Sequence, residues 1–223
     1  MAATLENIAK LRYFTGVDSS QVGGLSQLFS EKSYIKGQTI VAEGERDETL
    51  HFVNTGVVKI YKTSAEGKEQ IIKLARPGES FNDIAVFSNG PSPYSAQALG
   101  TLTMIYKISK NDLMPVMKNN VKVTLNAVEI LADQCRLLLT LIEDLSFKNV
   151  TNRVAKILLQ HSVPGPEGMP RLTQYEMAAM AGTAREVVGR SLKTLEDSGA
   201  IKLERHRIVI SDKEYMKQLA GFN

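Results

Sequence analysis

Residues 172–210, "LTQYEMAAMAGTAREVVGRSLKTLEDSGAIKLERHRIVI", decide how the C-terminal part of the chain folds. Thr173 and Glu176 have the spacing of a capping box, in which each side chain bonds a backbone N–H at the start of a helix. Gly182 follows two turns later and predicts the end of that helix, because glycine adopts the left-handed conformation readily. A short helix is therefore expected between Thr173 and Gly182.

A second helix is expected at once, because Thr183 and Glu186 repeat the T-x-x-E spacing. It runs until Ser198 and Gly199, which together form a stop signal. Two short helices joined by a glycine turn form a helix-turn-helix. Residues 200–210 then have the pattern of a β-hairpin, so the unit is predicted to be winged.

The outer face of the second helix carries side chains that can read DNA bases. Arg185 and Arg190 lie five residues apart, about 140° around the helix axis, so both can flank the floor of a major groove. Arginine can contact guanine with two hydrogen bonds, and Glu186 can accept one from cytosine N4. The alternative is that Glu186 only caps the helix and that both arginines are solvated. Contacts to the DNA backbone are expected from Thr151, Thr173, Gln174, Thr183, Lys193, Lys202 and His206.

Residues 33–108 have the pattern of a small β-domain. Short β-favouring runs such as "TLHFVNTG" and "VVKIYKTSAEG" alternate with glycine turns at roughly 8–12-residue spacing. This spacing is typical of a jelly roll, here expected as a β-roll. The chain is therefore predicted to be an α+β protein, with an N-terminal β-roll and a C-terminal winged helix-turn-helix.

A long helical pattern connects these two parts, and Ser109 with Asp112 predicts where it starts. Apolar residues recur every seven positions in two columns, as they do in a dimeric coiled coil. The alternative is a helix that packs only on the core of its own domain. The predicted dimer seam consists of Val121, Val128, Leu131, Cys135, Leu138, Ile142 and Leu145.

The composition excludes several kinds of site. The 223 residues carry a net charge of +3, which is compatible with a nucleic-acid partner without proving one. Cys135 is the single cysteine, so an internal disulfide, an iron–sulfur cluster and a four-cysteine zinc site are excluded. The three histidines are too scattered to predict a metal site. With no long apolar run and no signal-peptide pattern, we expect no membrane span and a cytoplasmic location.

Over about residues 10–220 the chain resembles the CRP/FNR family of bacterial transcription regulators. The most specific match is "AREVVGRSLKTLEDSGAI", which is similar to the family's recognition helix. The resemblance implies a homodimer that reads a palindromic TGTGA-like site on double-stranded DNA through Arg185, Glu186 and Arg190. It also implies a sensor domain over residues 1–108, a dimerisation helix and hinge over 109–147, and a DNA-binding domain over 148–223. RNA polymerase is an implied partner, and the loop "HSVPGPEGMP" lies where family members contact it.

The stretch "SFNDIAVFSNGPSPYSAQA", residues 80–98, aligns with the phosphate-binding cassette of the family. Cyclic-nucleotide binders have a Gly-Glu pair where this chain has Asn82 and Asp83. They have an Arg-Ser or Arg-Thr pair where it has Tyr94 and Ser95. Losing the arginine leaves a buried phosphate without a counter-charge, which is costly. Cyclic AMP is therefore not the expected effector.

The dimer helix agrees with this expectation. By the same alignment, the two hydroxyl residues that recognise adenine in the family's cAMP-responsive members fall at Leu138 and Leu139, which offer adenine no hydrogen bond. The predicted effector pocket is therefore apolar or vacant. It consists of Asn82, Asp83, Ile84, Tyr94, Ser95, Leu138 and Leu139.

Several effectors stay open at this point. One is a small, largely apolar molecule, and another is haem with a diatomic gas, for which His51 is the only imidazole in the sensor domain. His51 lies in a predicted strand, where it is as often solvent-facing as buried. A third option is no ligand at all. Cys135 could sense oxidants, although a small buried core residue is the simpler interpretation.

Two other functions are weighed against an effector-controlled regulator of this kind. One is a cAMP-responsive regulator with an atypical cassette. The other is a β-roll that acts as a regulatory or binding module without a DNA function. The sequence contains no P-loop, no G-x-S-x-G motif and no plausible pair of nucleophile and histidine, so an enzyme is not expected.

Overall fold

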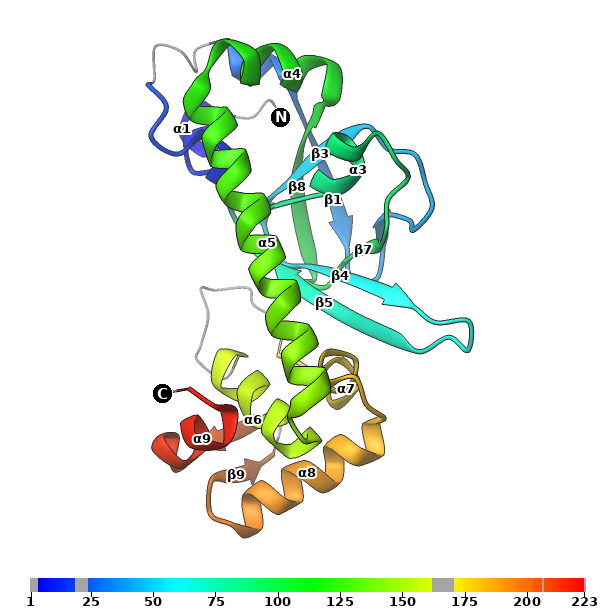
Figure 1. The fold of residues 1–223 in the computed structure, drawn as a ribbon, viewed down its shortest axis with the longest axis vertical. Coiled ribbons are helices and arrows are strands. Elements are labelled where there is room, and N and C mark those ends of the chain that lie inside the picture. The colour runs from blue at the N-terminus through cyan, green and yellow to red at the C-terminus, as the bar shows by residue number, and fades with distance from the viewer. Residues whose placement is uncertain (1–3, 19–23, 162–170, 206, 223) are drawn as a thin grey trace. The chain divides into compact units, whose positions relative to one another are not determined.

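A computed structural model of the chain describes residues 4–18, 24–161, 171–205 and 207–222 (Figure 1). Contacts divide the chain into two units. One unit contains Met1–Lys62 and Lys73–Leu137, and the other contains Thr63–Ile72 and Leu138–Asn223. The predicted α+β class, with a β-roll, a long helix and a winged helix-turn-helix, is confirmed.

The β-roll consists of two four-stranded sheets. The first has the order β1 (Phe29–Ile35), β8 (Leu102–Ser109), β3 (Thr49–Thr55) and β6 (Ser80–Phe81). The second has the order β2 (Thr39–Val41), β7 (Ser95–Ala98), β4 (Val58–Thr63) and β5 (Glu69–Ala75). The pairs β1–β8, β8–β3, β3–β6, β2–β7 and β7–β4 are antiparallel, as expected for hairpin-rich strands with intervening turns.

The turn between β3 and β4 depends on a glycine. Gly56 has a φ of 84°, in the left-handed region that residues with a Cβ rarely adopt. A Cβ at this position would lie 2.6 Å from Thr103 Oγ1 and 2.8 Å from the carbonyl oxygen of Leu102. Both the backbone conformation and the close approach of β8 therefore require glycine here.

Short helices form much of the segment before β1, and one lies between β6 and β7. They are α1 (Leu5–Ala9), the 3-10 turns η1 (Arg12–Phe14) and η2 (Leu25–Leu28), and α3 (Asp83–Ser88). After β8 the chain forms α4 (Lys110–Asn119) and α5 (Val121–Phe147), and the Ser109 side chain accepts the N–H of Asp112 as predicted. The predicted single helical pattern is thus two helices, because the backbone is extended at Asn120.

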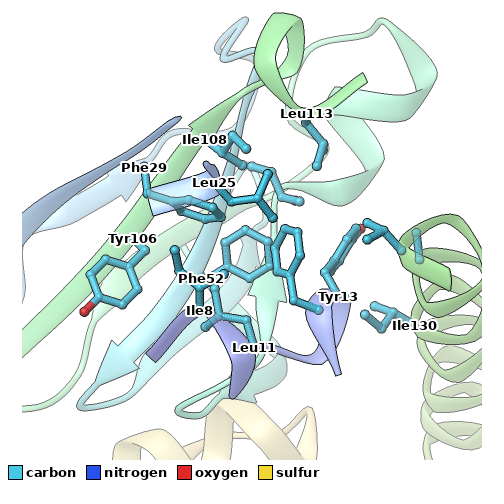
Figure 2. Close-up of a cluster of buried hydrophobic side chains, with 14 of the residues drawn as sticks. Ile8, Leu11, Tyr13, Leu25, Phe29, Phe52, Tyr106, Ile108, Leu113 and Ile130 are labelled. Carbon is cyan, nitrogen blue, oxygen red and sulfur yellow. The ribbon is translucent and has the colours of Figure 1, made fainter. Parts of the chain in front are cut away.

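Aromatic rings fill the core of the β-roll, and α5 closes it (Figure 2). The rings of Phe29 and Phe52 lie 5.9 Å apart between their centroids. Val123, Ala127 and Ile130 recur at helical spacing on one face of α5 and are buried against this cluster. The opposite face of α5, which carries Val121 and Val128, is exposed.

In the described residues after α5, helices α6 to α9 pack together with a two-stranded wing (Figure 1). These elements are α6 (Val150–His161), α7 (Gln174–Ala181), α8 (Arg185–Asp197), β9 (Ile201–Glu204), β10 (Arg207–Ile210) and α9 (Lys213–Ala220). The predicted hairpin is confirmed, with Ile201 opposite Ile210 and Glu204 opposite Arg207. In the part of the chain that the structure describes, no helix is long and apolar enough to cross a membrane.

Candidate nucleic-acid interface and effector cassette

The first helix of the pair starts with the predicted capping box. Thr173 N donates to Glu176 Oε2 at 2.6 Å, and Glu176 N donates to Thr173 Oγ1 at 3.2 Å. Gly182 ends the helix with a φ of 64°. Thr173 is one of the expected backbone contacts, and its hydroxyl also bonds the Glu176 carboxylate at 2.9 Å. Gln174, the next expected contact, is exposed.

The predicted capping box of the second helix is wrong. The N-cap of α8 is Ala184, and no side chain caps it. Thr183 is still part of the preceding turn, because its N–H donates to the carbonyl oxygen of Ala178 at 3.1 Å. Glu186 is therefore the second residue of α8 instead of the third, and its side chain is not used as a cap.

The three predicted base readers are exposed on one side of α8. Arg185, Glu186 and Arg190 have no side-chain hydrogen bond or ion pair with any residue that the structure describes. The alternative in which Glu186 caps its own helix is thus excluded. The opposite side of α8 is buried in the C-terminal core and consists of Val188, Ser191, Leu192 and Leu195.

The other expected backbone contacts differ in how free their side chains are. Lys193 forms ion pairs with Asp197 at 3.0 Å and Glu196 at 3.4 Å, so it would have to share its charge with a phosphate. Lys202 lies exposed on β9 of the wing. Thr183 is half-buried. His206 lies outside the described residues.

A hollow of about 490 Å³ lies beside α8. Residues from the start of α6, from α8 and from α9 line it, including Thr151 and Arg190. The Thr151 hydroxyl contacts Ser191 Oγ at 3.3 Å, which fixes it at the rim between α6 and α8. The sequence does not indicate this hollow, because its walls come from three separate segments.

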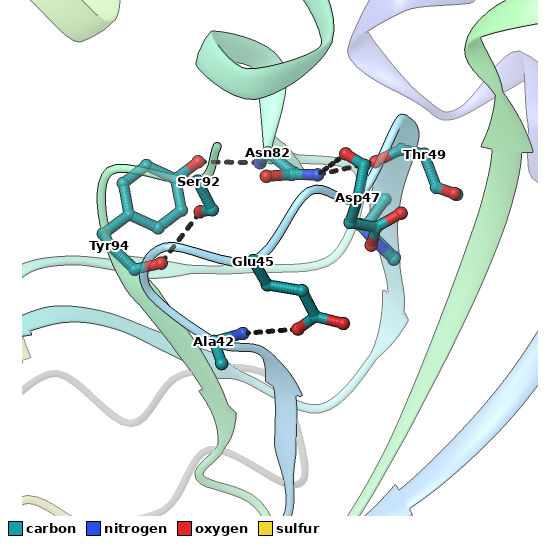
Figure 3. Close-up of polar contacts among 8 residues, drawn as sticks. Ala42, Glu45, Asp47, Thr49, Asn82, Ser92 and Tyr94 are labelled. Carbon is teal, nitrogen blue, oxygen red and sulfur yellow. Dashed lines mark hydrogen bonds and ion pairs between the residues drawn. The ribbon is translucent and has the colours of Figure 1, made fainter. Parts of the chain in front are cut away.

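The predicted effector cassette, residues 80–98, is held by hydrogen bonds among its own residues and to Asp47 and Thr49 (Figure 3). The backbone N–H of Asn82, just before α3, donates to the Tyr94 hydroxyl oxygen at 2.7 Å. Asn82 also donates from its side chain to the carbonyl oxygens of Asp47 and Thr49. Burial, and then the charge of Asp83, raise the pKa of Tyr94, so its hydroxyl stays protonated. Tyr94 therefore occupies the N–H that begins the cassette helix.

The second cassette pair is engaged as well. The hydroxyl of Ser95 accepts the backbone N–H of Glu43 at 3.1 Å. The loop that carries Glu43 is fastened further, because Ser92 N donates to the carbonyl oxygen of Glu45 at 2.8 Å. Ile84 lies on α3 and is 37% exposed. The part of the cassette that corresponds to a phosphate site is thus held by neighbouring residues of the chain.

Asp83 is fully buried and is held by two hydroxyl groups. Its Oδ1 accepts hydrogen bonds from Tyr13 at 2.6 Å and from Ser80 at 2.8 Å. Burial, followed by the charge of Asp83, raises the pKa of Tyr13, which therefore remains a donor. Sequence reasoning missed Tyr13, because it lies 70 residues from Asp83 and no local pattern links the two.

His51 is fully buried, so the structure has the buried one of the two orientations that the strand pattern left open. Its Nε2 lies 2.7 Å from Asp47 Oδ2, and its ring stacks on Phe81 at 5.0 Å. Burial lowers the pKa of His51 despite the opposing effect of Asp47. A haem ligand needs an accessible ring nitrogen, so His51 does not fit that role. Among the described residues, no cluster of three or more His, Cys, Asp or Glu side chains could hold a metal ion.

The outer face of α5 is apolar and uncovered. Val121, Val128 and Ile142 are 70, 58 and 59% exposed, and Cys135 is exposed with them. The second predicted column, three residues on, is less uniform, because Leu131 is half-buried and Leu138 and Leu145 are each 38% exposed. The sequence prediction missed a third column, which lies four residues after the first and contains Leu125 and Leu139. These side chains are 53 and 67% exposed. The signal was present, since helical neighbours occur at both three and four residues.

Comparisons with known proteins agree with this architecture. Residues 31–120 match the family model of the cyclic nucleotide-binding domain, and residues 152–219 match that of the Crp-like helix-turn-helix domain. A "CRP-like cAMP-activated global transcriptional regulator" of Mycobacterium tuberculosis is 30% identical, over 96% of this chain and 99% of the relative. A "Cyclic AMP receptor protein" of Thermus thermophilus is 27% identical, over 93% and 95%.

Solved structures share the fold. FixK2 of Bradyrhizobium japonicum is 25% identical with a TM-score of 0.74, over 86% of this chain and 96% of that one. The "c-di-GMP Responsive Global Regulator CLP" of Xanthomonas campestris is 21% identical with a TM-score of 0.75, over 86% and 99%, a likeness of fold alone. With both domains matched in order and a relative covered over nearly its full length, the chain belongs to the CRP/FNR family of transcription regulators.

Proposed function

We propose that the chain is a homodimer that reads a palindromic TGTGA-like DNA site and whose effector is not cyclic AMP. The observation that carries the DNA part is the outer face of α8, where Arg185, Glu186 and Arg190 are exposed and unpaired among the described residues. Each arginine has the geometry to contact guanine O6 and N7, and Glu186 to accept from cytosine N4. A glutamate on a DNA-facing helix would otherwise repel phosphate, so its free carboxylate supports base reading.

The backbone contacts position this helix on the duplex. Lys202 on the wing and Gln174 at the start of α7 are exposed, and both stay as proposed phosphate contacts with Thr151, Thr173, Thr183 and Lys193. Such contacts carry affinity and salt dependence but no sequence information. RNA polymerase remains a proposed partner, and most of the loop proposed to contact it, residues 162–170, lies outside the described residues.

The uncovered face of α5 supports the dimer. Val121, Leu125, Val128, Cys135, Leu139 and Ile142 follow the four-and-three spacing of a coiled-coil seam and are all exposed. An isolated protein rarely exposes so long an apolar stripe on one helix. We therefore propose a second copy of the chain as its partner, with the central column at residues 121, 128, 135 and 142.

Cys135 allows this seam to be tested directly. In a parallel two-stranded seam a residue of the central column meets its own copy, so the two thiols come close enough for a disulfide. Mild oxidation is expected to convert the protein to a covalent dimer on a non-reducing gel. As a control, a Cys135→Ser, Glu129→Cys double variant places the thiol outside the seam and should stay monomeric on the gel. Equal cross-linking of the two proteins would contradict this register.

The cassette supports an effector other than cyclic AMP, or none. Relatives named for cyclic AMP and a structural neighbour named for c-di-GMP share the fold, so family membership leaves the ligand open. In this chain Tyr94 bonds the Asn82 N–H, Ser95 bonds the Glu43 N–H, and no arginine stands at either cassette pair. A cyclic phosphate would have to displace these bonds without gaining a counter-charge.

A cAMP-responsive regulator with an atypical cassette is the second candidate, because the M. tuberculosis relative is named as cAMP-activated. The predicted contribution of Leu138 and Leu139 to an apolar effector pocket stays a prediction. A β-roll module without DNA function is disfavoured by the match of residues 152–219 to a Crp-like helix-turn-helix domain.

Competition binding tests the proposed function. A labelled duplex with two TGTGA-type half-sites in inverted orientation is bound by the purified protein, and unlabelled palindromic or unrelated duplexes compete. The palindromic competitor is expected to displace the label at much lower concentration, because only it offers base contacts in addition to phosphate contacts. Equal competition by both duplexes would refute sequence-specific reading.

A further inference from the structure

The junction between α5 and α6 is two residues long and is held by several side-chain hydrogen bonds. The guanidinium of Arg153, in the first turn of α6, donates to three carbonyl oxygens. Nη1 donates to Lys148 at 2.6 Å and to Asp144 at 3.4 Å, and Nε donates to Ala181 at 2.8 Å. One side chain therefore joins the end of α5, the start of α6 and the end of α7.

An ion-pair network lies beside this guanidinium. Asp144 in the last turn of α5 lies 2.9 Å from Lys148 Nζ and 2.5 Å from Lys156 Nζ, and all three side chains are at least four-fifths buried. Lys148 also donates to the carbonyl oxygen of Ala220 at the end of α9. Burial raises the pKa of Asp144, but Lys156 and Lys148 outweigh it and hold the pKa below its ordinary range.

We call Arg153, Asp144, Lys148 and Lys156 the junction clamp. The clamp ties the last turn of α5 to α6, α7 and α9, and all of these lie in one unit. Ile142 of the proposed dimer seam is less than one turn from Asp144. Within this unit, the clamp therefore holds the core in which α8 packs with α6, α7 and α9 against the last turn of α5.

The orientation of α8 matters because a dimer must fit two half-sites at once. The recognition helices of such dimers bind about 34–36 Å apart, one helical turn of DNA. Each base pair inserted between the half-sites moves them by about 3.4 Å and also rotates one relative to the other. A dimer with a rigid junction is expected to bind tightly to DNA with one half-site spacing. A dimer with a loose junction is expected to bind several spacings, each with lower affinity.

We propose that the junction clamp selects the spacing between the two half-sites, so that Arg153 and Asp144 are positioning residues for DNA recognition without touching DNA. This inference rests on the proposed function, since it requires a dimer that reads a palindrome. A merely structural role for the clamp would lower affinity for all duplexes alike. A positioning role changes the preference among duplexes that contain identical half-sites.

The test measures binding to a panel of duplexes with identical half-sites whose spacer is shortened or lengthened by one base pair at a time. The wild-type protein is expected to prefer one spacer clearly. Arg153→Met should weaken binding to the duplex with that spacer on the order of tenfold, as expected if only a tenth of the molecules held the fitting orientation. Binding to the duplexes with other spacers should weaken by less than about threefold. The preference for guanine at the base read by Arg185 should persist in each half-site.

Asp144→Asn removes the charge that holds both lysines and keeps the side-chain shape. It should reduce the difference in affinity between the preferred spacer and the others, and it keeps the test possible if Arg153→Met folds poorly. Lys217→Met is the matched control, because it removes a half-buried cation outside the clamp that is paired with Glu214 on α9 at 2.7 Å. An unchanged profile in both clamp variants would overturn the inference and leave the proposed function intact. A wild-type protein that prefers no duplex over random DNA would overturn the proposed function itself.

Discussion

Arg185→Ala and Arg190→Ala are each expected to reduce the preference for the palindromic site by about 5- to 150-fold, equivalent to about 1–3 kcal/mol. The loss should be confined to one guanine per half-site, because each arginine has room for one bidentate contact. In the free protein neither guanidinium is bonded to another described side chain. The substitutions should therefore remove DNA contacts without disturbing the fold. Binding to a set of duplexes with single base changes measures the effect.

Lys202→Ala is the matched control for the arginine variants. This side chain lies exposed on the wing and is a proposed phosphate contact, so its loss should weaken all duplexes alike. The slope of log affinity against log salt should fall by about one unit. If the arginine variants behave like Lys202→Ala, with equal loss on palindromic and random DNA, the assignment of base reading to α8 is wrong.

Tyr94→Phe is expected to destabilise the protein by about 1–3 kcal/mol, because it leaves the buried Asn82 N–H without an acceptor. The hydroxyl is the acceptor for this N–H at 2.7 Å, and both residues are buried. The ring itself stays in place, so the change isolates the hydroxyl group. Urea unfolding followed by circular dichroism measures the difference as a shift in midpoint at constant slope.

Tyr175→Phe provides the control for this substitution. Tyr175 is 55% exposed on α7, and its hydroxyl does not accept a buried backbone N–H as that of Tyr94 does. The same change should therefore alter the free energy of unfolding by close to zero. A Tyr94→Phe protein as stable as the wild type would mean that the cassette N–H is free to bind a ligand. That outcome would remove the main structural support for excluding a cyclic phosphate.

Much of the fold follows from local sequence signals. The capping box at Thr173, the cap at Ser109 and the glycine that ends α7 mark helix boundaries, and the structure has each of them where the sequence predicts. The T-x-x-E at Thr183 has the same letters but caps no helix. Its threonine is bonded into the previous turn, and only the geometry of the turn between the helices decides this.

The contacts of the cassette residues could not be predicted from the sequence. The replaced Gly-Glu and Arg-Ser pairs are visible in the sequence, but the groups that replace the ligand are not. Tyr13 reaches Asp83 from 70 residues away, and Glu43 reaches Ser95 from 52 residues away. The burial of His51 depends on both faces of β3 being covered, which a period-two pattern cannot predict. Contacts of this kind are properties of the assembled roll.

We propose that this chain reads DNA through α8 without a cyclic-AMP signal. Fluorescence anisotropy with the palindromic and an unrelated duplex, each with and without saturating cyclic AMP, tests it most directly. We predict at least about a thousandfold preference for the palindrome at physiological salt, unchanged by the nucleotide. A rise in affinity for the palindrome on adding cyclic AMP would refute the proposed effector, and equal binding of the two duplexes would refute DNA reading by α8.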